Sequence, residues 1–415
     1  MKKHISVPSV DTFMMWKNKM KRIFTNFYGF DDVKITREEI FVEDGVIVEE
    51  FARNEADEII DCQNLALIPS FTDLHVHFRD PGFTYKEDLK TGSLAALKGG
   101  VTNVLLMGNT KPTVSSREVY EDIIKRVEEL DLIGVDQVYT ITKNFDGKSL
   151  NHLDTMPKSV KFISDDGHGV DDGEVMYKAM LKARELGVNM TLHEEVAGVS
   201  AIDYEVAEEA MTLRDCYYAY KLKMPVHFSH VSTKGAMTAI KYFKDLGAKI
   251  TCEVTPHHLY YSEKSRDEMK VNPPIRKEED RLFLLEMIKE GYVDAIATDH
   301  APHSKEEKEK GAPGFIGIET SFSTCYEVLV KSGLISLNQL IKIMSTRPSE
   351  ILGIKKGKLD PGYLADFNLI NLDKSYIYKE EDIRSKSKNS LMIGKKLYGQ
   401  IQKVYRKGVL KYEHN

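Results

Sequence analysis

The chain has 415 residues, of which 42% are hydrophobic and 29% charged, an ordinary globular composition that predicts a packed core and, at roughly 150 residues each, about two to three domains. Its 58 basic and 64 acidic side chains leave a formal charge of −6, which argues against nucleic acid as a partner because phosphate binding needs a basic surface. No apolar run is long enough for a membrane span, and the N-terminus lacks a secretory-type apolar stretch. We therefore expect a soluble, cytoplasmic protein with no membrane partner.

The first 69 residues precede the regular part of the chain. Residues 1–25 hold six basic side chains and one acidic side chain, which predicts a solvated amphipathic helix or a frayed terminus, with a docking or targeting segment as the alternative. Residues 40–42 and 46–48 are β-rich and flank the turn pair Asp44-Gly45, and residues 65–69 form another β-rich run. This pattern is typical of a small antiparallel hairpin unit.

From residue 70 onward, short apolar runs alternate with helical patterns. Eight such runs occur, at residues 72–78, 101–107, 135–141, 160–163, 190–193, 226–230, 249–254 and 293–297. Amphipathic helices are expected between them at 86–98, 117–130, 174–186, 203–221, 234–246 and 278–289. Eight βα units predict an α/β fold, a (β/α)8 TIM-like barrel.

After about residue 355 the pattern returns to β, with a hairpin-like stretch at 405–409. We expect the N- and C-terminal flanks to pair into one small β domain. The predicted boundaries are 1–69 for the N-terminal segment and part of the β domain, 70–354 for the barrel, and 355–415 for the remainder of the β domain.

The first barrel strand carries a polar face. A period of two divides residues 73–79 between two faces, with Asp73, His75, His77 and Arg79 on one and Leu74, Val76 and Phe78 on the other. The apolar face must meet the helices, so the polar face should point into the barrel, where buried imidazoles need partners. A His-x-His pair on a strand can bind one Zn²⁺, and two hydrogen-bonded core histidines are the alternative.

Further potential ligands follow other strands, at the barrel end where catalytic groups of this architecture lie. They are Asp165, Asp166, His193, His230 and Asp299. Together with the His-x-His pair they exceed what one tetrahedral ion needs, which predicts two bridged metal ions and metal-assisted attack on a carbonyl or phosphoryl centre. His227 is expected to pack on the face opposite His230, and His152 to lie at the surface.

Residues in the loops at the same rim should select the substrate. Arg79 offers a bidentate fork for a carboxylate, and Asn109, Asn272 and His303 lie in neighbouring loops. These groups fit an anionic amide better than a neutral sugar.

Longer motifs resemble those of dihydroorotases, and the type I branch of this amidohydrolase-superfamily group is the closer match. They include Asp-Leu-His-Val-His-Phe-Arg at 73–79 and Ala-Thr-Asp-His-Ala-Pro-His at 297–303, with further matches at 80–83, 86–88, 99–102, 107–112, 230–233, 253–258 and 272–274. The resemblance spans about residues 65–370. It implies a zinc-dependent enzyme that reversibly cyclises N-carbamoyl-L-aspartate to (S)-dihydroorotate and water in de novo pyrimidine biosynthesis.

The resemblance also implies roles for individual residues. Two Zn²⁺ ions are expected, the first bound by His75 and His77 and the second by His193 and His230. Asp166 matches the bridging aspartate of the type I branch, and Asp299 matches the residue that ligates the first zinc and shuttles the proton. The residues that match substrate contacts are His77, Arg79, Asn109, Asn272, His303, Pro313 and Gly314, although segment 312–317 is one residue short of the family's pattern.

Two other interpretations remain. An allantoinase or hydantoinase would have a bridging lysine, which Lys161 could supply, but Arg79 in its segment at 78–82 argues against it. A non-catalytic homologue that serves as a structural partner of aspartate carbamoyltransferase would have an incomplete ligand set. The resemblance leaves open whether the chain forms a homodimer and whether it works with such a carbamoyltransferase.

Overall fold

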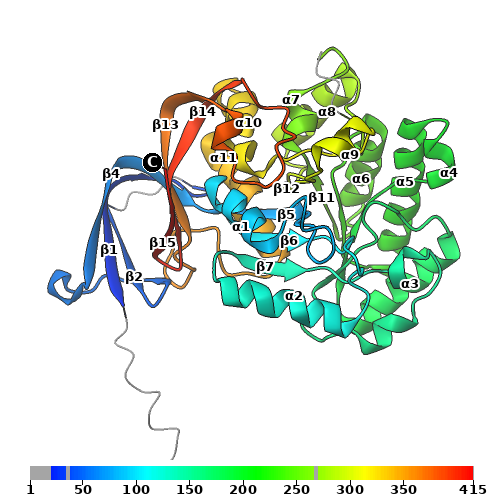
Figure 1. Cartoon of the computed structure of the whole chain (residues 1–415), viewed down its shortest axis with the longest axis horizontal. Helices are drawn as coiled ribbons and strands as arrows, with labels where there is room; N and C mark the ends of the chain where they lie inside the picture. Colours follow the sequence, from blue (N-terminus) through cyan, green and yellow to red (C-terminus); the bar gives the residue numbers. More distant parts are fainter. Residues whose placement is uncertain (1–19, 34–37, 266–269, 415) are drawn as a thin grey trace, which may run out of the picture.

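The computed structural model describes residues 20–33, 38–265 and 270–414. Figure 1 shows a barrel of strands wrapped by helices and, on one side of it, a β-sheet formed by both ends of the chain. Most of the basic segment 1–25 lies outside the described residues. Its last five residues begin strand β1 (Lys21–Gly29), so the expectation of an amphipathic helix is wrong there. None of the described helices combines the length and apolar character needed to cross a bilayer.

The sheet beside the barrel has seven strands in the order β15-β14-β13-β4-β1-β2-β3. Their bounds, besides β1, are β2 (Glu39–Glu43), β3 (Val46–Val48), β4 (Glu58–Pro69), β13 (Phe367–Ile377), β14 (Lys396–Arg406) and β15 (Val409–Glu413). Asp44 and Gly45 both have positive φ, 50° and 80°, as the tight turn between β2 and β3 requires. Strand β4 pairs with β13, so the two flanks form one sheet as predicted, while the domain boundaries themselves stay a prediction.

The barrel contains the eight predicted parallel strands. They are β5 (Phe71–Val76), β6 (Val101–Leu106), β7 (Gly134–Gln137), β8 (Phe162–Ile163), β9 (Asn189–Leu192), β10 (Val226–Phe228), β11 (Ile250–Val254) and β12 (Ala295–Ile296). They form one run from β5 to β7 and another from β8 to β12. Parallel bridges between Val76 and His300 and between Tyr139 and Ile163 join the two runs at both edges. The predicted (β/α)8 barrel is therefore confirmed.

Helices cover the outside of the barrel (Figure 1). The long ones are α1 (Leu89–Lys98), α2 (Arg117–Leu130), α3 (Gly173–Leu186), α5 (Tyr204–Leu222), α6 (Lys234–Asp245) and α8 (Glu278–Glu290), and the short ones are α4 (Ala197–Ser200), α7 (Pro256–Tyr260), α9 (Lys305–Glu309), α10 (Ser321–Cys325), α11 (Leu337–Ile341) and α12 (Arg347–Ile351). Side chains fix where they begin: Ser116 accepts a hydrogen bond from the backbone of Val119 at the start of α2, and Asp203 caps α5 in the same way.

One expectation about the first barrel strand is wrong. The pairing of β5 with β6 shifts between Asp73 and Val76, so two residues of β5 face one residue of β6. Leu74 packs with Leu105 and Phe162 in a cluster that draws on four barrel strands, β5, β6, β8 and β12, whereas Val76 belongs to the larger cluster shared with the helices. Such an irregularity breaks strict alternation. Leu74 therefore faces the barrel interior together with His75, instead of lying opposite it.

Candidate metal and active site

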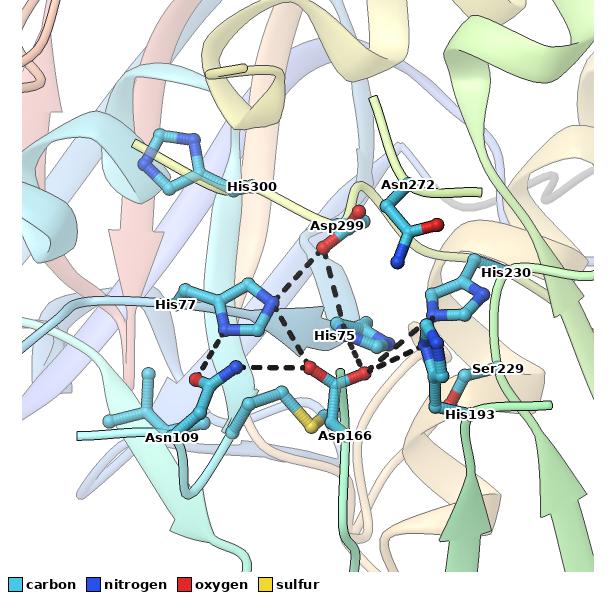
Figure 2. A network of polar contacts seen from close by, with 12 residues as sticks. His75, His77, Asn109, Asp166, His193, Ser229, His230, Asn272, Asp299 and His300 are labelled. Carbon is cyan, nitrogen blue, oxygen red and sulfur yellow. Dashed lines mark hydrogen bonds and ion pairs between the residues drawn. The ribbon is translucent and has the colours of Figure 1, made fainter. Parts of the chain in front are cut away.

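The candidate ligands meet at one end of the barrel. His75 lies in β5 and His77 just after it, and Asp166, His193, His230 and Asp299 each follow a different strand, β8, β9, β10 and β12. All six side chains are buried. Figure 2 shows them pointing toward one another, while His300, next to Asp299 in the sequence, lies apart from the group. The structure thus brings together the whole ligand set expected from the sequence.

Asp166 lies at the centre of the group. Its Oδ1 is 3.1 Å from His75 Nε2 and 3.6 Å from both His193 Nδ1 and His230 Nε2. The nitrogens of His193 and His230 are 3.0 Å apart. Asp166 Oδ2 is 3.5 Å from His77 Nε2. One carboxylate therefore faces two sets of imidazole nitrogens, which is the arrangement a bridging ligand needs.

A second group of donors surrounds His77. Its Nε2 is 3.1 Å from Asp299 Oδ1, which lies 3.7 Å from His75 Nε2. The donors thus form two triplets, His75, His77 and Asp299 on one side and His75, Asp166 and His230 on the other, with the atoms of each triplet within 4.8 Å of one another. Each triplet could hold a metal ion.

The outward-facing nitrogens of three histidines are held by acceptors. His75 Nδ1 lies 3.2 Å from Glu253 Oε1, His77 Nδ1 lies 2.8 Å from Asn109 Oδ1, and His193 Nε2 lies 3.0 Å from Glu195 Oε2. An acceptor there holds the ring proton on the outer nitrogen and leaves the inner nitrogen free to bind a metal. The inner nitrogen of His75 is buried and lies 3.1 Å from Asp166 Oδ1, but it makes no hydrogen bond within the described residues.

These observations fit metal binding. Ligand atoms bound to one tetrahedral ion at about 2.0–2.1 Å lie about 3.3 Å from one another. The separations of 3.0 to 3.7 Å at this site match that spacing, and imidazole with carboxylate is a donor set that zinc accepts. Without a metal ion between them, the buried imidazole nitrogens would face one another with no partner to replace the water they lost on burial, which costs free energy.

Backbone strain is concentrated at the same place. Arg79, His230 and Asp299 have positive φ, at 58°, 34° and 47°. Residues other than glycine rarely adopt this conformation, and it costs on the order of 1–3 kcal/mol per residue where it persists. Its presence at three candidate site residues is typical of a functional site.

The charges of the two carboxylates follow from their neighbours. Burial would raise the pKa of Asp166, but His75 and His230 outweigh it, so the pKa lies well below its usual range. Burial also opposes ionisation of Asp299, yet the hydrogen bond with His77 and the nearby His75 hold its pKa below the usual value. Both groups are therefore anionic at neutral pH.

The predicted substrate contacts surround this group. Arg79 makes two long contacts, from Nε to the Pro302 carbonyl at 3.3 Å and from Nη2 to His303 Nε2 at 3.4 Å, which leave most of its guanidinium for another partner. Burial and Arg79 lower the pKa of His303 to about 4, so His303 is neutral. Asn109 also contacts Asp166, at 3.3 Å.

Asn272 and Pro313 line a second part of the site. They border a cavity of about 550 Å³, together with Glu195 and Tyr204. Asn272 donates to Glu195 at 3.1 Å and also contacts the Tyr204 hydroxyl. Gly314 follows with φ of 116°, and a Cβ there would lie 2.8 Å from Ala301 Cβ. The narrow fit explains why glycine occupies that position.

Sequence reasoning missed the residues that hold the histidines from outside. Glu253 is fully buried and contacts both His75 and His227, the latter at 3.0 Å. The expectation that His227 packs on the opposite face is therefore wrong. Strand β10 ends at Phe228 and His230 has positive φ. The alternation of side chains along a strand therefore does not extend to His230 and cannot predict how the two histidines are oriented relative to each other. Glu195, beside His193, could have been found only from its position next to a ligand.

Contacts show the positions of three other residues. Asp165 accepts hydrogen bonds from the backbone of Ile141 and Thr142 at 2.7 and 3.0 Å, so it fixes a loop, whereas Asp166 lies in the group that could hold a metal ion. Lys161 contacts Asp136 and the Leu352 carbonyl at 2.9 and 3.1 Å, away from the ligands. His152 is buried beside Thr140, so its expected surface position is wrong.

The chain is similar to known proteins over most of its length. A family model described as "Amidohydrolase family" matches residues 66–411. A protein of Clostridium botulinum (strain Eklund 17B / Type B) named "Dihydroorotase" is 43% identical over 398 residues, which cover 95% of this chain and 100% of that protein. A "Dihydroorotase" of Elusimicrobium minutum (strain Pei191) is 38% identical, over 91% and 93%. The solved L-hydantoinase (dihydropyrimidinase) of Arthrobacter aurescens has a TM-score of 0.85 at 21% identity, over 94% and 95%, which shows a common fold.

Proposed function

The chain belongs to the amidohydrolase family, and we propose that it is a zinc-dependent dihydroorotase that reversibly cyclises N-carbamoyl-L-aspartate to (S)-dihydroorotate and water in pyrimidine biosynthesis. The observation that carries the proposal is the convergence of six candidate ligand side chains close to Arg79. The dihydroorotases that share 35–43% of their residues with this chain support the choice of substrate.

Two Zn²⁺ ions are proposed. His75, His77 and Asp299 would hold the first, His193 and His230 would hold the second, and Asp166 would bridge them. Bound zinc supplies Lewis acidity toward the amide carbonyl and activates water for attack. The outer partners Glu253, Asn109 and Glu195 support this assignment because they fix the orientation of three ligand rings.

The protein's own residues orient the substrate and move the proton. Arg79 would bind the substrate carboxylate with its free guanidinium, and neutral His303 beside it could donate one hydrogen bond without adding charge. In the hydrolytic direction the ionised Asp299 accepts a proton from the attacking water at a carboxylate oxygen. It then delivers this proton to the leaving amide nitrogen. In ring closure the same group accepts the amide proton and returns it to the departing oxygen.

The contacts of Lys161 favour this function over that of an allantoinase or hydantoinase. A bridging lysine would have to reach the centre of the ligand group, and Lys161 is instead paired with Asp136. A non-catalytic role is disfavoured because the ligand set is complete. A cytoplasmic location and association with an aspartate carbamoyltransferase stay predictions from the sequence.

One experiment tests the proposal. The purified protein is analysed for metal content and assayed in both directions with dihydroorotate and N-carbamoyl-L-aspartate, with allantoin and hydantoin as comparison substrates. We expect about two zinc ions per chain and turnover of the dihydroorotate pair alone. Loaded protein that hydrolyses hydantoin or allantoin but not dihydroorotate would overturn the substrate assignment, and loaded protein inactive on all of them would overturn the enzymatic one.

A further inference from the structure

The connection between β13 and β14, residues 378–395, extends from the seven-stranded sheet toward the barrel (Figure 1). Its residues 390–392 are buried. Leu391 lines the same cavity of about 550 Å³ that Asn272 and Pro313 border. This part of the C-terminal flank therefore contributes to the wall of the candidate active site.

Hydrogen bonds fix the first half of this connection. Lys386 donates from its backbone nitrogen to Glu87 Oε1 at 3.1 Å, and the Ser385 hydroxyl also contacts Glu87. The Ser387 hydroxyl donates to the Lys86 carbonyl at 2.8 Å. Glu87 is fully buried, so these bonds form away from competing water. The connection is thus anchored against the loop that leads into α1.

Asn389 joins two loops of the barrel. Its Nδ2 donates to the Gly314 carbonyl at 3.2 Å, and its Oδ1 accepts from the His303 backbone nitrogen at 3.4 Å. Its own carbonyl accepts from the Ile316 backbone nitrogen at 2.9 Å. A side-chain amide can serve both loops at once because it carries a donor and an acceptor. One residue of the C-terminal flank therefore ties the loop of His303 to the loop of Gly314.

Both loops carry groups assigned to the substrate, and Asn389 matters most for one of them. His303 Nε2 lies 3.4 Å from Arg79 Nη2. The Gly314 carbonyl has a second donor, Lys308 Nζ at 2.7 Å. The backbone nitrogen of His303 has no other acceptor within the described part of the chain. The contact with Asn389 is therefore what holds the backbone at His303.

We propose that Asn389 is a positioning residue for the substrate, which holds His303 and the backbone at Gly314 where they meet the substrate carboxylate beside Arg79. This inference rests on the proposed function and deepens it. Asn389 makes no hydrogen bond to any of the six candidate metal ligands, all of which are described residues. Loss of its amide weakens binding of the substrate and of the transition state alike, which raises KM and leaves kcat unchanged.

Steady-state kinetics of the zinc-loaded full chain with dihydroorotate give the first test. We expect Asn389→Ala to raise KM about three- to tenfold, the effect of about one lost hydrogen bond, with kcat and zinc content within about twofold of wild type. Asn389→Leu fills a similar volume without a hydrogen-bonding group and should behave in the same way, which separates loss of the amide from loss of packing.

Asn371→Ala is the matched control. Asn371 is also partly buried and accepts from the backbone nitrogen of Lys374 in the same strand, β13, at 3.0 Å. It lies in the same C-terminal flank as Asn389 but contacts neither of the two loops. The KM of this variant should equal that of the wild type.

A double-mutant cycle distinguishes positioning from a general loss of structure. If Asn389 acts through His303, the effect of Asn389→Ala on KM should shrink to below about twofold in a His303→Ala background, whereas independent effects would multiply. Hydrogen exchange gives a readout besides activity. The backbone amide of His303 should exchange faster in Asn389→Ala than in the wild type, because it has lost its acceptor.

The outcomes separate this inference from the proposed function. An unchanged KM of Asn389→Ala, multiplying effects in the cycle, or unchanged exchange at His303 would each refute the role of Asn389 and leave the proposed function intact. A zinc-loaded wild type that does not turn over dihydroorotate would overturn the proposed function, and the role of Asn389 in that reaction with it.

Discussion

Replacement of Glu253 by Gln tests how the site keeps His75 ready to bind metal. The Glu253 side chain is fully buried and contacts His75 Nδ1 at 3.2 Å and His227 Nε2 at 3.0 Å. Burial would raise the pKa of Glu253, but the hydrogen bonds with His227 and His75 lower it to about 2, so it is a carboxylate at neutral pH. Glutamine keeps the shape but has one accepting oxygen and a donating amide nitrogen, so one of the two imidazoles loses its acceptor.

The size of the effect follows from these contacts. A buried donor left without an acceptor costs about 1–3 kcal/mol, and removal of an outer partner of a metal ligand weakens metal binding by about 10- to 100-fold. That range corresponds to about 1.4–2.7 kcal/mol of binding free energy. We expect the zinc dissociation constant of Glu253→Gln to rise by this factor while the fold is retained.

Zinc competition with a chelator of known affinity measures the change directly, without relying on turnover. Glu319→Gln provides the control, since Glu319 is also buried but accepts from Arg384 and Ser385 at 2.8 and 2.9 Å, away from the ligands. Its zinc affinity should equal that of the wild type. A folded Glu253→Gln that binds zinc within about twofold of wild type would show that the reasoning about His75 is wrong.

Three further predictions each concern one purified variant. Arg79→Lys should keep its zinc but lose at least about tenfold in kcat/KM for dihydroorotate, about 1.4 kcal/mol, because the planar fork is lost; a loss below about threefold would exclude the carboxylate contact. Asp299→Asn should retain at least part of its zinc and fall below about a tenth of wild-type kcat in both directions, because it cannot accept the proton; higher activity would place the proton transfer elsewhere, with His303 the next candidate. Burial lowers the pKa of Lys356 from 10.5 to about 7. Between pH 10.5 and pH 7 the lysine is therefore protonated in the unfolded chain but neutral in the folded one, so the free energy of unfolding falls as the pH falls. Lys356→Met removes this effect. The free energy of unfolding, measured in urea, should therefore rise by about 2 kcal/mol more in the wild type than in the variant from pH 7 to pH 9. An equal change in both proteins would contradict the lowered pKa of Lys356.

The candidate ligands could be predicted from the sequence because they lie in or at the end of short apolar runs. In a parallel barrel the ends of such runs meet at one rim, so His193 and His230 could be placed near each other although 36 residues separate them. The predicted runs were longer than the strands: β10 ends at Phe228 and β12 spans only Ala295 and Ile296. Except for His75, which lies in β5, the candidate ligands therefore lie in the loops just beyond the strands.

The remaining features depend on information that a pattern of polarity does not contain. Leu74 and His75 face the same way because of a local shift in strand pairing, and nothing in the residue types at these positions indicates it. Glu253 lies in a strand distant in sequence from His75, so its contact depends on the closure of the barrel. Residues 21–25 are basic and amphipathic, yet they pair with β2 and β4, which shows how a partner strand overrides local preference.

The continuity of the seven-stranded sheet with the barrel has a consequence for folding during synthesis. Strand β4 leads through Ser70 directly into β5, the strand that carries His75, and Pro69 pairs with Phe367 of β13. The β13 strand pairs in turn with β14, and β14 pairs with β15. While the ribosome has yet to release β13, strand β4 lacks its partner on that side, although β5 already has its neighbour β6. The candidate ligand group can reach its final geometry only after Asp299 and the Val76–His300 bridge have emerged, and until then the nascent chain carries His75 and His77 without their partners.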